Sequence, residues 1–275
     1  MLKAVTRRTA LGACAGAMAL GSARLSLAAP GAPTKAELFV FQAPATDHLV
    51  LAVISVSSGD RVCGSASDVR MHAGTHSWKI DRKRASQSSI MSDGTGVRVF
   101  AGMVHGASAN GLTYDATVLE TPQLAAAATR EGLPVWAEIR TADGSRIRVG
   151  NPLVAELLAG DPALSRIYHA ATPAEDRALF TNAIADLVAR RTKVRMLGAD
   201  AHAKRLADLL LPDVITYRSN LPAGFNFAGR NGRHPGDRTA AVQETLLNGA
   251  VAPGISSTAF VLTSAFPYFS RPVVL

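Results

Sequence analysis

The sequence predicts an α+β fold, a β-rich, sandwich-like antiparallel sheet domain with several short helices concentrated in the C-terminal half. Three observations support this prediction. Short apolar runs bounded by turn residues dominate residues 29–150, and the clearest of them forms a hairpin. From residue 151 onward, apolar residues recur at helical spacing. Because no internal repeat or low-complexity linker divides the chain, we expect a single domain over residues 29–275.

The first predicted strands are short β-branched or apolar runs at residues 38–41, 48–56 and 97–104. Pro44 separates the first two. Residues 57–96 are rich in Ser, Gly and charged side chains, which predicts a long loop or an insertion.

A hairpin is predicted over residues 135–149, where inward and outward residues alternate and Asp143-Gly144 turns the chain. On its polar face we expect Arg140, Arg146 and Arg148 opposite Glu138. We interpret this face as a solvated sheet surface in preference to an anion site.

Helix start and stop signals predict the elements of the second half. Pro at a first helical position, Gly just past an end, and a Thr-x-x-Glu capping box are such signals. They predict a helix from Asn151-Pro152 to Gly160, one after the capping box Thr172–Glu175, one over 201–211 and one over 238–248, in addition to a shorter Ala-rich helix over 122–130. In the helix after the capping box, Phe180, Ile184, Leu187 and Val188 share one face. In the helix over 201–211, Leu206, Leu209 and Leu210 point inward.

The N-terminus carries an export signal pattern. Arg7 and Arg8 precede an Ala/Gly-rich apolar run, and a small-x-small motif ends at Ala28. This predicts a twin-arginine signal peptide over residues 1–28, the twin-arginine translocation machinery as a partner during export, and a periplasmic or secreted protein. The run is too short and too polar for a membrane helix, so we expect no stable span after cleavage. A lipoprotein cleavage box at Leu11–Cys14 is the less favoured alternative, because no apolar stretch precedes it.

Charge and cysteine content narrow the function classes. The formal net charge is +8, and it falls to +4 if the signal leaves with its four cations, Lys3, Arg7, Arg8 and Arg24. So small and dispersed an excess argues against a nucleic-acid partner. Only Cys63 would remain, so the mature chain has no intrachain disulfide and must be stabilised by its core.

No G-x-S-x-G, H-E-x-x-H or Gly-rich phosphate loop occurs in the sequence. This absence favours a non-catalytic protein and leaves an enzyme as the less favoured alternative. The nearest metal pattern is His72 and His76, with His105 as a third ligand; two imidazoles four residues apart share one face of a helix. Gly74 between them favours a loop, in which the two imidazoles would not share one face to bind a metal ion.

The stretch NGRHPGD is a basic turn that leads into the last predicted helix. Its glycines and proline suit a tight turn, and Asp237 is placed to cap the helix. Arg233 and His234 lack a structural explanation in the sequence, and beside a helix N-terminus they would suit an anion or another ligand. We favour the scaffold role and keep Arg233, His234 and Asp237 as a candidate ligand turn.

The segment LLPDVITYRSNLPAGFNFAGRNGRHPGDRTAAVQETLLNG, ending at Gly249, and FPYFSRP (266–272) resemble the C-terminal signature of domain of unknown function 4331, a family of exported bacterial proteins. VRVFAGMVHG (97–106) and VGNPLVAELL (149–158) resemble further family motifs in the same order. The resemblance implies a β-rich exported domain with helices inserted in its second half. It implies no activity.

The chain departs from the family pattern at several positions. Residues 30–41 lack the His/Asp-bearing segment that follows the signal in members of the family, and Arg218 stands where they carry Asp. After the NGR turn, Asp237-Arg238 replaces an acidic pair. The resemblance therefore implies a divergent or shortened member that has lost any cation site built on those acidic residues.

Two function classes follow from the sequence. The first is a non-catalytic periplasmic binding or interaction module, favoured by the β-rich pattern and the missing catalytic motifs. The alternative is a metal- or cofactor-dependent periplasmic protein, suggested by the loop histidines and by export in the folded state. The sequence identifies no particular cofactor.

Overall fold

The computed structural model describes residues 36–56, 66–82, 91–92, 96–105, 113–141, 144–192, 198–225, 230–237, 239–248 and 263–269. The predicted signal over residues 1–28 lies outside these ranges. In the described ranges, no helix combines the length and apolar character needed to cross a bilayer.

The first sheet is antiparallel and five-stranded, in the order β1-β2-β7-β6-β5. The long strands of this sheet carry apolar side chains on both faces, which is the pattern of a sheet that is covered on both sides. The strands of the sheet are β1 (Ala36–Gln42), β2 (Leu49–Val56), β5 (Met91–Ser92), β6 (Arg98–His105) and β7 (Thr113–Thr121).

The second sheet is also antiparallel, in the order β10-β8-β3-β4, with β9 paired to β8 as well. Its strands are β3 (Ala66–Ala73), β4 (His76–Asp81), β8 (Leu133–Thr141), β9 (Arg146–Val149) and β10 (Ile215–Tyr217). A separate two-stranded ribbon pairs β11 (Gly224–Phe225) with β12 (Arg230–Asn231).

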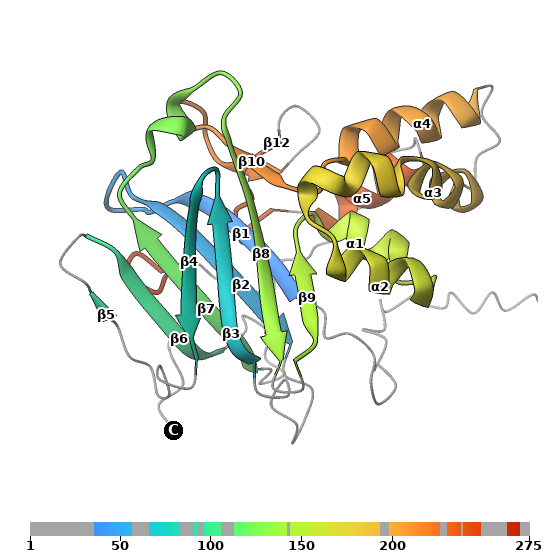
Figure 1. Ribbon diagram of the computed structural model, residues 1–275. Helices are drawn as coiled ribbons and strands as arrows, with labels where there is room; N and C mark the ends of the chain where they lie inside the picture. The colour runs from blue at the N-terminus through green and yellow to red at the C-terminus, as the bar shows by residue number, and fades with distance from the viewer. Residues whose placement is uncertain are drawn as a thin grey trace, which may run out of the picture. The chain divides into compact units, whose positions relative to one another are not determined.

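The two sheets pack face to face around one apolar core, and Figure 1 shows β3, β4, β8 and β9 as a layer in front of the first sheet. The core combines Leu51 and Leu119 of the first sheet with Met71 and Ala137 of the second, all of them fully buried. The predicted α+β fold with a sandwich-like antiparallel domain is confirmed.

The outer face of the first sheet is apolar too. Phe41, Val50 and Val118 on this face belong to a second buried cluster, together with Tyr268 and Phe269 near the C-terminus. The first sheet is therefore buried on both sides, whereas the second sheet has a polar outer face.

The prediction of a loop over residues 57–96 is wrong for its described part, because β3 and β4 form a hairpin there. Val69, Met71 and Ala73 alternate with polar residues and point into the core, and Gly74 turns the chain with φ +58°. The alternation was missed in the sequence because the outward residues of both strands are polar and the neighbouring residues are rich in Ser and Gly.

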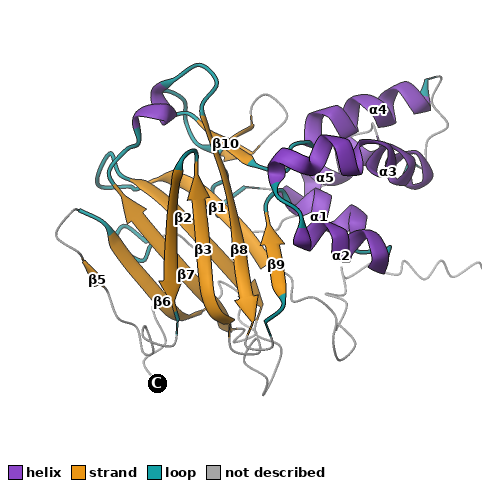
Figure 2. Cartoon of the chain, in the orientation of Figure 1, coloured by secondary structure: helices purple, strands orange, loops and turns teal. Residues whose placement is uncertain are grey.

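The α-helices gather beyond the β9 edge of the second sheet (Figure 2). Asn151 caps the first of them through Leu153 N, and the predicted capping box of Thr172 and Glu175 is present. The described helices are η1 (Ala125–Ala128), α1 (Pro152–Leu158), α2 (Pro162–Ala170), η2 (Pro173–Glu175), α3 (Asp176–Arg191), α4 (Ala199–Leu210) and α5 (Thr239–Asn248).

Two helix predictions need correction. The Ala-rich stretch 122–130 forms only one short 3-10 turn, η1. Leu209, predicted to point inward, is 44% exposed, because the buried face of α4 runs through Ala203, Leu206 and Leu210. These residues pack with Phe180 and other apolar side chains of α3 and α1 in a third buried cluster.

A buried triad of charged residues, Arg148, Asp176 and Asp213, joins the second sheet to the helices. Arg148 on β9 donates to both carboxylate oxygens of Asp176 at the start of α3, at 2.6 and 2.5 Å. Asp213 follows α4; its amide donates to Asp176 Oδ2 (2.7 Å) and its carbonyl accepts from Arg148 (3.1 Å). None of the three side chains is exposed.

Both carboxylate oxygens of Asp213 accept hydrogen bonds. Oδ1 accepts from Asn151 N at 2.6 Å, and Oδ2 accepts from the hydroxyl of Tyr168 on α2. A Cβ at Gly150 would lie 2.5 Å from Asp213 Oδ2, so only glycine fits at that position. The triad thus joins β9, α1, α2, α3 and the segment after α4.

Replacing Arg148 by Met is expected to lower the free energy of unfolding by about 3–5 kcal/mol, because two carboxylates would remain buried without their cation. The measurement is urea unfolding followed by circular dichroism. As a matched control, Arg191→Met removes an exposed pair with Glu156 (3.2 Å) and is expected to cost less than about 1 kcal/mol. Equal costs for the two variants would contradict the structural role of the triad.

Candidate functional site

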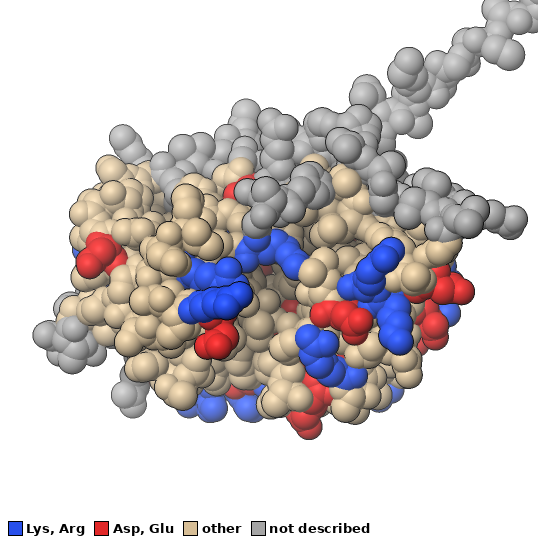
Figure 3. Space-filling view, turned by 90° about the horizontal axis from the view of Figure 1, so that it is seen from above, with Lys and Arg blue, Asp and Glu red and all other residues tan. Residues whose placement is uncertain are grey.

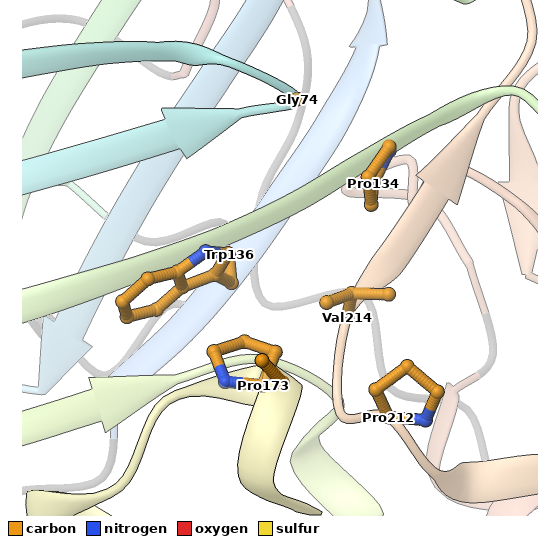
Figure 4. A pocket seen from close by; sticks show the side chains of 7 residues that line it. Gly74, Pro134, Trp136, Pro173, Pro212 and Val214 are labelled. Carbon is orange, nitrogen blue, oxygen red and sulfur yellow. The ribbon is translucent and has the colours of Figure 1, made fainter.

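The main candidate site is a small apolar pocket, here called the Trp136 pocket, with a volume of about 240 Å³. Figure 4 shows the labelled side chains facing a common space from the end of β8, from η2 and from the segment before β10. The lining residues are Gly74, Pro134, Trp136, Pro173, Ala174, Pro212 and Val214. Prolines and a tryptophan are rigid, so this lining is largely preformed.

Polar groups surround the Trp136 ring, which lies on the outer face of the second sheet. His72 on β3 stacks on it with ring centroids 4.0 Å apart and an interplanar angle of 6°. The guanidinium carbons of Arg146 and Arg148 lie 5.8 and 5.9 Å from its centroid, within cation–π distance. Burial lowers the pKa of His72, so the imidazole is neutral at pH 7, and its Nε2 is buried without a hydrogen-bond partner among the described residues.

Next to the pocket, three arginines share one buried carboxylate, that of Glu138, whose side chain is 5% exposed. Arg146 forms a close ion pair with it, and nitrogens of Arg70 and Arg140 lie at 3.6 and 3.9 Å. Asp68 approaches Arg70 at 3.7 Å. The predicted gathering of arginines opposite Glu138 therefore exists, although Arg148 belongs to the buried triad instead.

Basic and acidic groups lie beside one another on the face that Figure 3 shows, without a continuous single-sign patch. The excess of arginine around Glu138 is a local feature. That face lacks the broad basic footprint that the phosphates of a polyanion need.

Burial shifts the pKa values of Asp213 in the triad and of Tyr168 and His169 beside it. Burial raises the pKa of Asp213 to about 6, although Arg148, Tyr168 and the Asn151 amide favour its ionised form. Burial also raises the pKa of Tyr168, which stays a hydroxyl donor. His169 accepts a hydrogen bond from Arg148 N at 3.1 Å, and burial lowers its pKa to about 4, so it is neutral above that pH.

The structure does not bring the proposed metal ligands His72 and His76 together. They lie on the paired strands β3 and β4, where Ala73 is opposite His76 and His72 is opposite Ser77. His72 stacks on Trp136 at the outer face, whereas His76 stacks on Trp78, which packs against the inner core. His105 ends β6 in the other sheet, and its side chain is outside those described.

In the described part of the chain, no group of three His, Cys, Asp or Glu side chains could hold a metal ion. The metal site stays a prediction. His72 and His76 lie on opposite faces of the sheet, because His76 is paired with Ala73, the neighbour of His72, and successive residues of a strand point to opposite faces.

The candidate ligand turn connects strand β1 to the segment before α5. Arg233 is 4% exposed; it donates to Glu37 Oε2 (2.7 Å) and to Leu38 O (3.3 Å) of β1, and it lies 4.5 Å from the Phe39 ring centroid. Its backbone also bridges to Val40. Arg233 is therefore satisfied by the protein itself, which the sequence could not show because its partners are almost 200 positions away.

The described bonds of Asp237 lie within the turn and to β11, and not to the last helix that it was predicted to cap. The helix α5 begins at Thr239, and Asp237 Oδ2 accepts from His234 N (2.6 Å) and Phe225 N (2.8 Å). The imidazole of His234 packs edge-on against Phe41, and burial lowers its pKa. The three residues of the turn stabilise the junction between β1, β11 and α5.

A second polar cluster, which no sequence motif indicated, surrounds Glu120 on β7. Its buried carboxylate contacts His48 Nδ1 (2.9 Å), Arg98 Nε (2.9 Å) and the hydroxyl of Tyr268 (2.9 Å). Burial raises the pKa of Tyr268 to about 12, and this residue has φ +71°, which is rare outside glycine. The cluster fastens the segment 263–269 to the first sheet.

Comparisons with protein-family models, with curated proteins and with solved structures find no match to this chain. The resemblance to domain of unknown function 4331 therefore stays a prediction.

Replacing Asp237 by Ala is expected to cost about 1–3 kcal/mol of unfolding free energy, because two backbone N–H groups lose their acceptor. Asp237→Asn keeps an acceptor oxygen and is expected to cost clearly less. Urea unfolding measures both variants. Asp208→Ala, in an exposed pair with Arg177, is the matched control and is expected to cost less than about 1 kcal/mol. An Asn variant as unstable as the Ala variant would show that the acceptor is not what matters.

Proposed function

We propose that this protein is a binding module for small carboxylates that carry one apolar ring or branched chain, with the Trp136 pocket as the site. The observation that supports this most is the combination of a preformed apolar pocket with an arginine cluster at Glu138 and a stacked, neutral His72. Ligand sites typically combine an apolar lining with a few polar groups of this kind.

The size of the pocket limits the ligand. Its volume of about 240 Å³ lies below the range of roughly 300–1,000 Å³ that is usual for drug-sized ligands. One ring or one branched chain fills such a space. The ring face of Trp136 and the flat faces of Pro173 and Pro212 give that group dispersion contacts.

The polar surroundings favour an anionic group on the ligand. Arg70, Arg140 and Arg146 gather around the carboxylate of Glu138, and the side chains of Arg70 and Arg140 are 36% and 40% exposed. Arginine binds carboxylates through paired donors in a planar fork. The unpartnered His72 Nε2 supplies a further hydrogen-bonding atom beside the Trp136 ring.

The cellular setting is part of the same proposal. The Arg7-Arg8 signal pattern supports export by the twin-arginine translocation machinery and a periplasmic or secreted binding module.

The fluorescence of the two tryptophans tests the proposal. In Trp78→Phe, Trp136 is the only reporter, and titration with cyclohexanecarboxylate at pH 7.5 is expected to give a saturable change with a Kd in about the millimolar range. Cyclohexylmethanol is expected to bind more weakly, because it lacks the carboxylate. Arg146→Gln in the same background should remove most of this difference, and Arg191→Gln should leave it unchanged.

The reciprocal variant Trp136→Phe retains only Trp78 and controls for non-specific effects of the probe. It is expected to show no saturable change. A response of equal size in both tryptophan variants, or none in Trp78→Phe, would contradict the assignment of the Trp136 pocket.

A further inference from the structure

Five of the seven lining residues of the Trp136 pocket lie next to a member of the buried triad, in the chain or in space. Pro212 and Val214 flank Asp213 in the chain, and η2, with Pro173 and Ala174, leads directly into Asp176. The fifth is Trp136 itself, whose ring lies 5.9 Å from the guanidinium of Arg148. The bonds within the triad therefore position the segments that carry Pro173, Ala174, Pro212 and Val214, beside Trp136.

Asp213 is surrounded by hydrogen-bond donors. Arg148 faces it from β9 at 3.9 Å, Tyr168 donates to it from α2, and the Asn151 amide donates to it from the start of α1. The other charged neighbour is Asp176 on α3, a like charge. His169, beside Tyr168, is already neutral at pH values well above its pKa of about 4.

Protonation disturbs this arrangement. A carboxylic acid has a hydroxyl that needs an acceptor, whereas the described partners of Asp213 are donors, apart from the hydroxyl of Tyr168. If Tyr168 accepts from the acid, it no longer donates to Asp213, which is the acceptor of its hydroxyl in the described hydrogen bonds. The attraction between Asp213 and Arg148 is lost as well.

Building on the proposed function, we propose that uptake of one proton by the triad loosens the Pro212–Val214 wall and weakens ligand binding in the Trp136 pocket. Asp213 is thus a positioning residue that links binding to pH. By linkage, a bound ligand also disfavours protonation of the triad.

The pH at which this occurs is accessible to the folded protein. The raised pKa of Asp213, about 6 against an ordinary 3.8, means that the folded state takes up this proton before the unfolded state does. Between pH 6 and 3.8, uptake at Asp213 therefore stabilises the folded state relative to the unfolded one. The expected transition is a local change in the pocket and is distinct from acid unfolding.

The first experiment needs no ligand. In Trp78→Phe, the emission of Trp136 is followed from pH 8 to 4.5, with circular dichroism to confirm that the protein stays folded. A transition with its midpoint near pH 6 is expected. It should persist when His72 is also replaced by Gln, which removes the titratable group stacked on the reporter, and it should disappear in Asp213→Asn.

Tyr168→Phe provides an independent variant that keeps both carboxylates. It removes a donor that lowers the pKa of Asp213, so the midpoint should move to higher pH. A transition that persists in Asp213→Asn, that disappears in His72→Gln, or that Tyr168→Phe leaves in place would overturn the inference. If Asp213→Asn does not fold, the shift in Tyr168→Phe decides.

The second experiment measures binding of cyclohexylmethanol, which has no titratable group in this range, to Trp78→Phe. The Kd is expected to rise about tenfold between pH 7.5 and pH 5, and to be equal at both pH values in Asp213→Asn. Saturable binding with one Kd at both pH values would refute the proton link and leave the proposed function standing. No saturable binding of either cyclohexylmethanol or cyclohexanecarboxylate at any pH would refute the proposed function, and the ligand-free transition would then decide on the inference.

Discussion

The buried ion pair between Arg148 and Asp176 is the interaction on which the rest of this structure depends. It closes the β9 edge of the second sheet with the N-terminus of α3, and Asp213 completes it from the segment after α4. Burying two carboxylates with one guanidinium is costly, and every oxygen and amide must find a partner. That requirement explains why Gly150, Asn151 and Tyr168 converge on the same point.

The two sheets of the sandwich differ in the polarity and the exposure of their outer faces. The first sheet is buried on both sides. Ion pairs of Arg233 with Glu37 and of Arg98 with Glu120 hold other segments against it, and the hydroxyl of Tyr268 also donates to Glu120. The second sheet presents its outer face with charged and aromatic side chains, and the triad fixes the adjacent loops against that face. An apolar pocket therefore lies where the polar sheet face meets the helices.

Local patterns in the sequence predicted the elements but not the sites. The hairpin of β8 and β9 and the capping box at Thr172 were predictable, because alternation and capping are local. The hairpin of β3 and β4 was missed, because Ser and Gly nearby outweighed the alternation around Met71. The triad and the cluster around Glu120 unite residues that are far apart in the chain, so no spacing rule could indicate them. Pairs of a buried carboxylate and a tyrosine, such as Asp213 with Tyr168, can be identified only from the folded structure.

Native-state amide hydrogen exchange tests the central role of the triad most directly. The amides of Asn151 and Asp213 donate to carboxylates of the triad, whereas that of Ala52 lies in the middle of the first sheet. If the triad holds the structure together, all three amides should exchange only through global unfolding, with equal opening free energies. Exchange of Asn151 and Asp213 about 100-fold faster than Ala52, after correction for intrinsic rates, would show that the triad opens locally and would contradict this account.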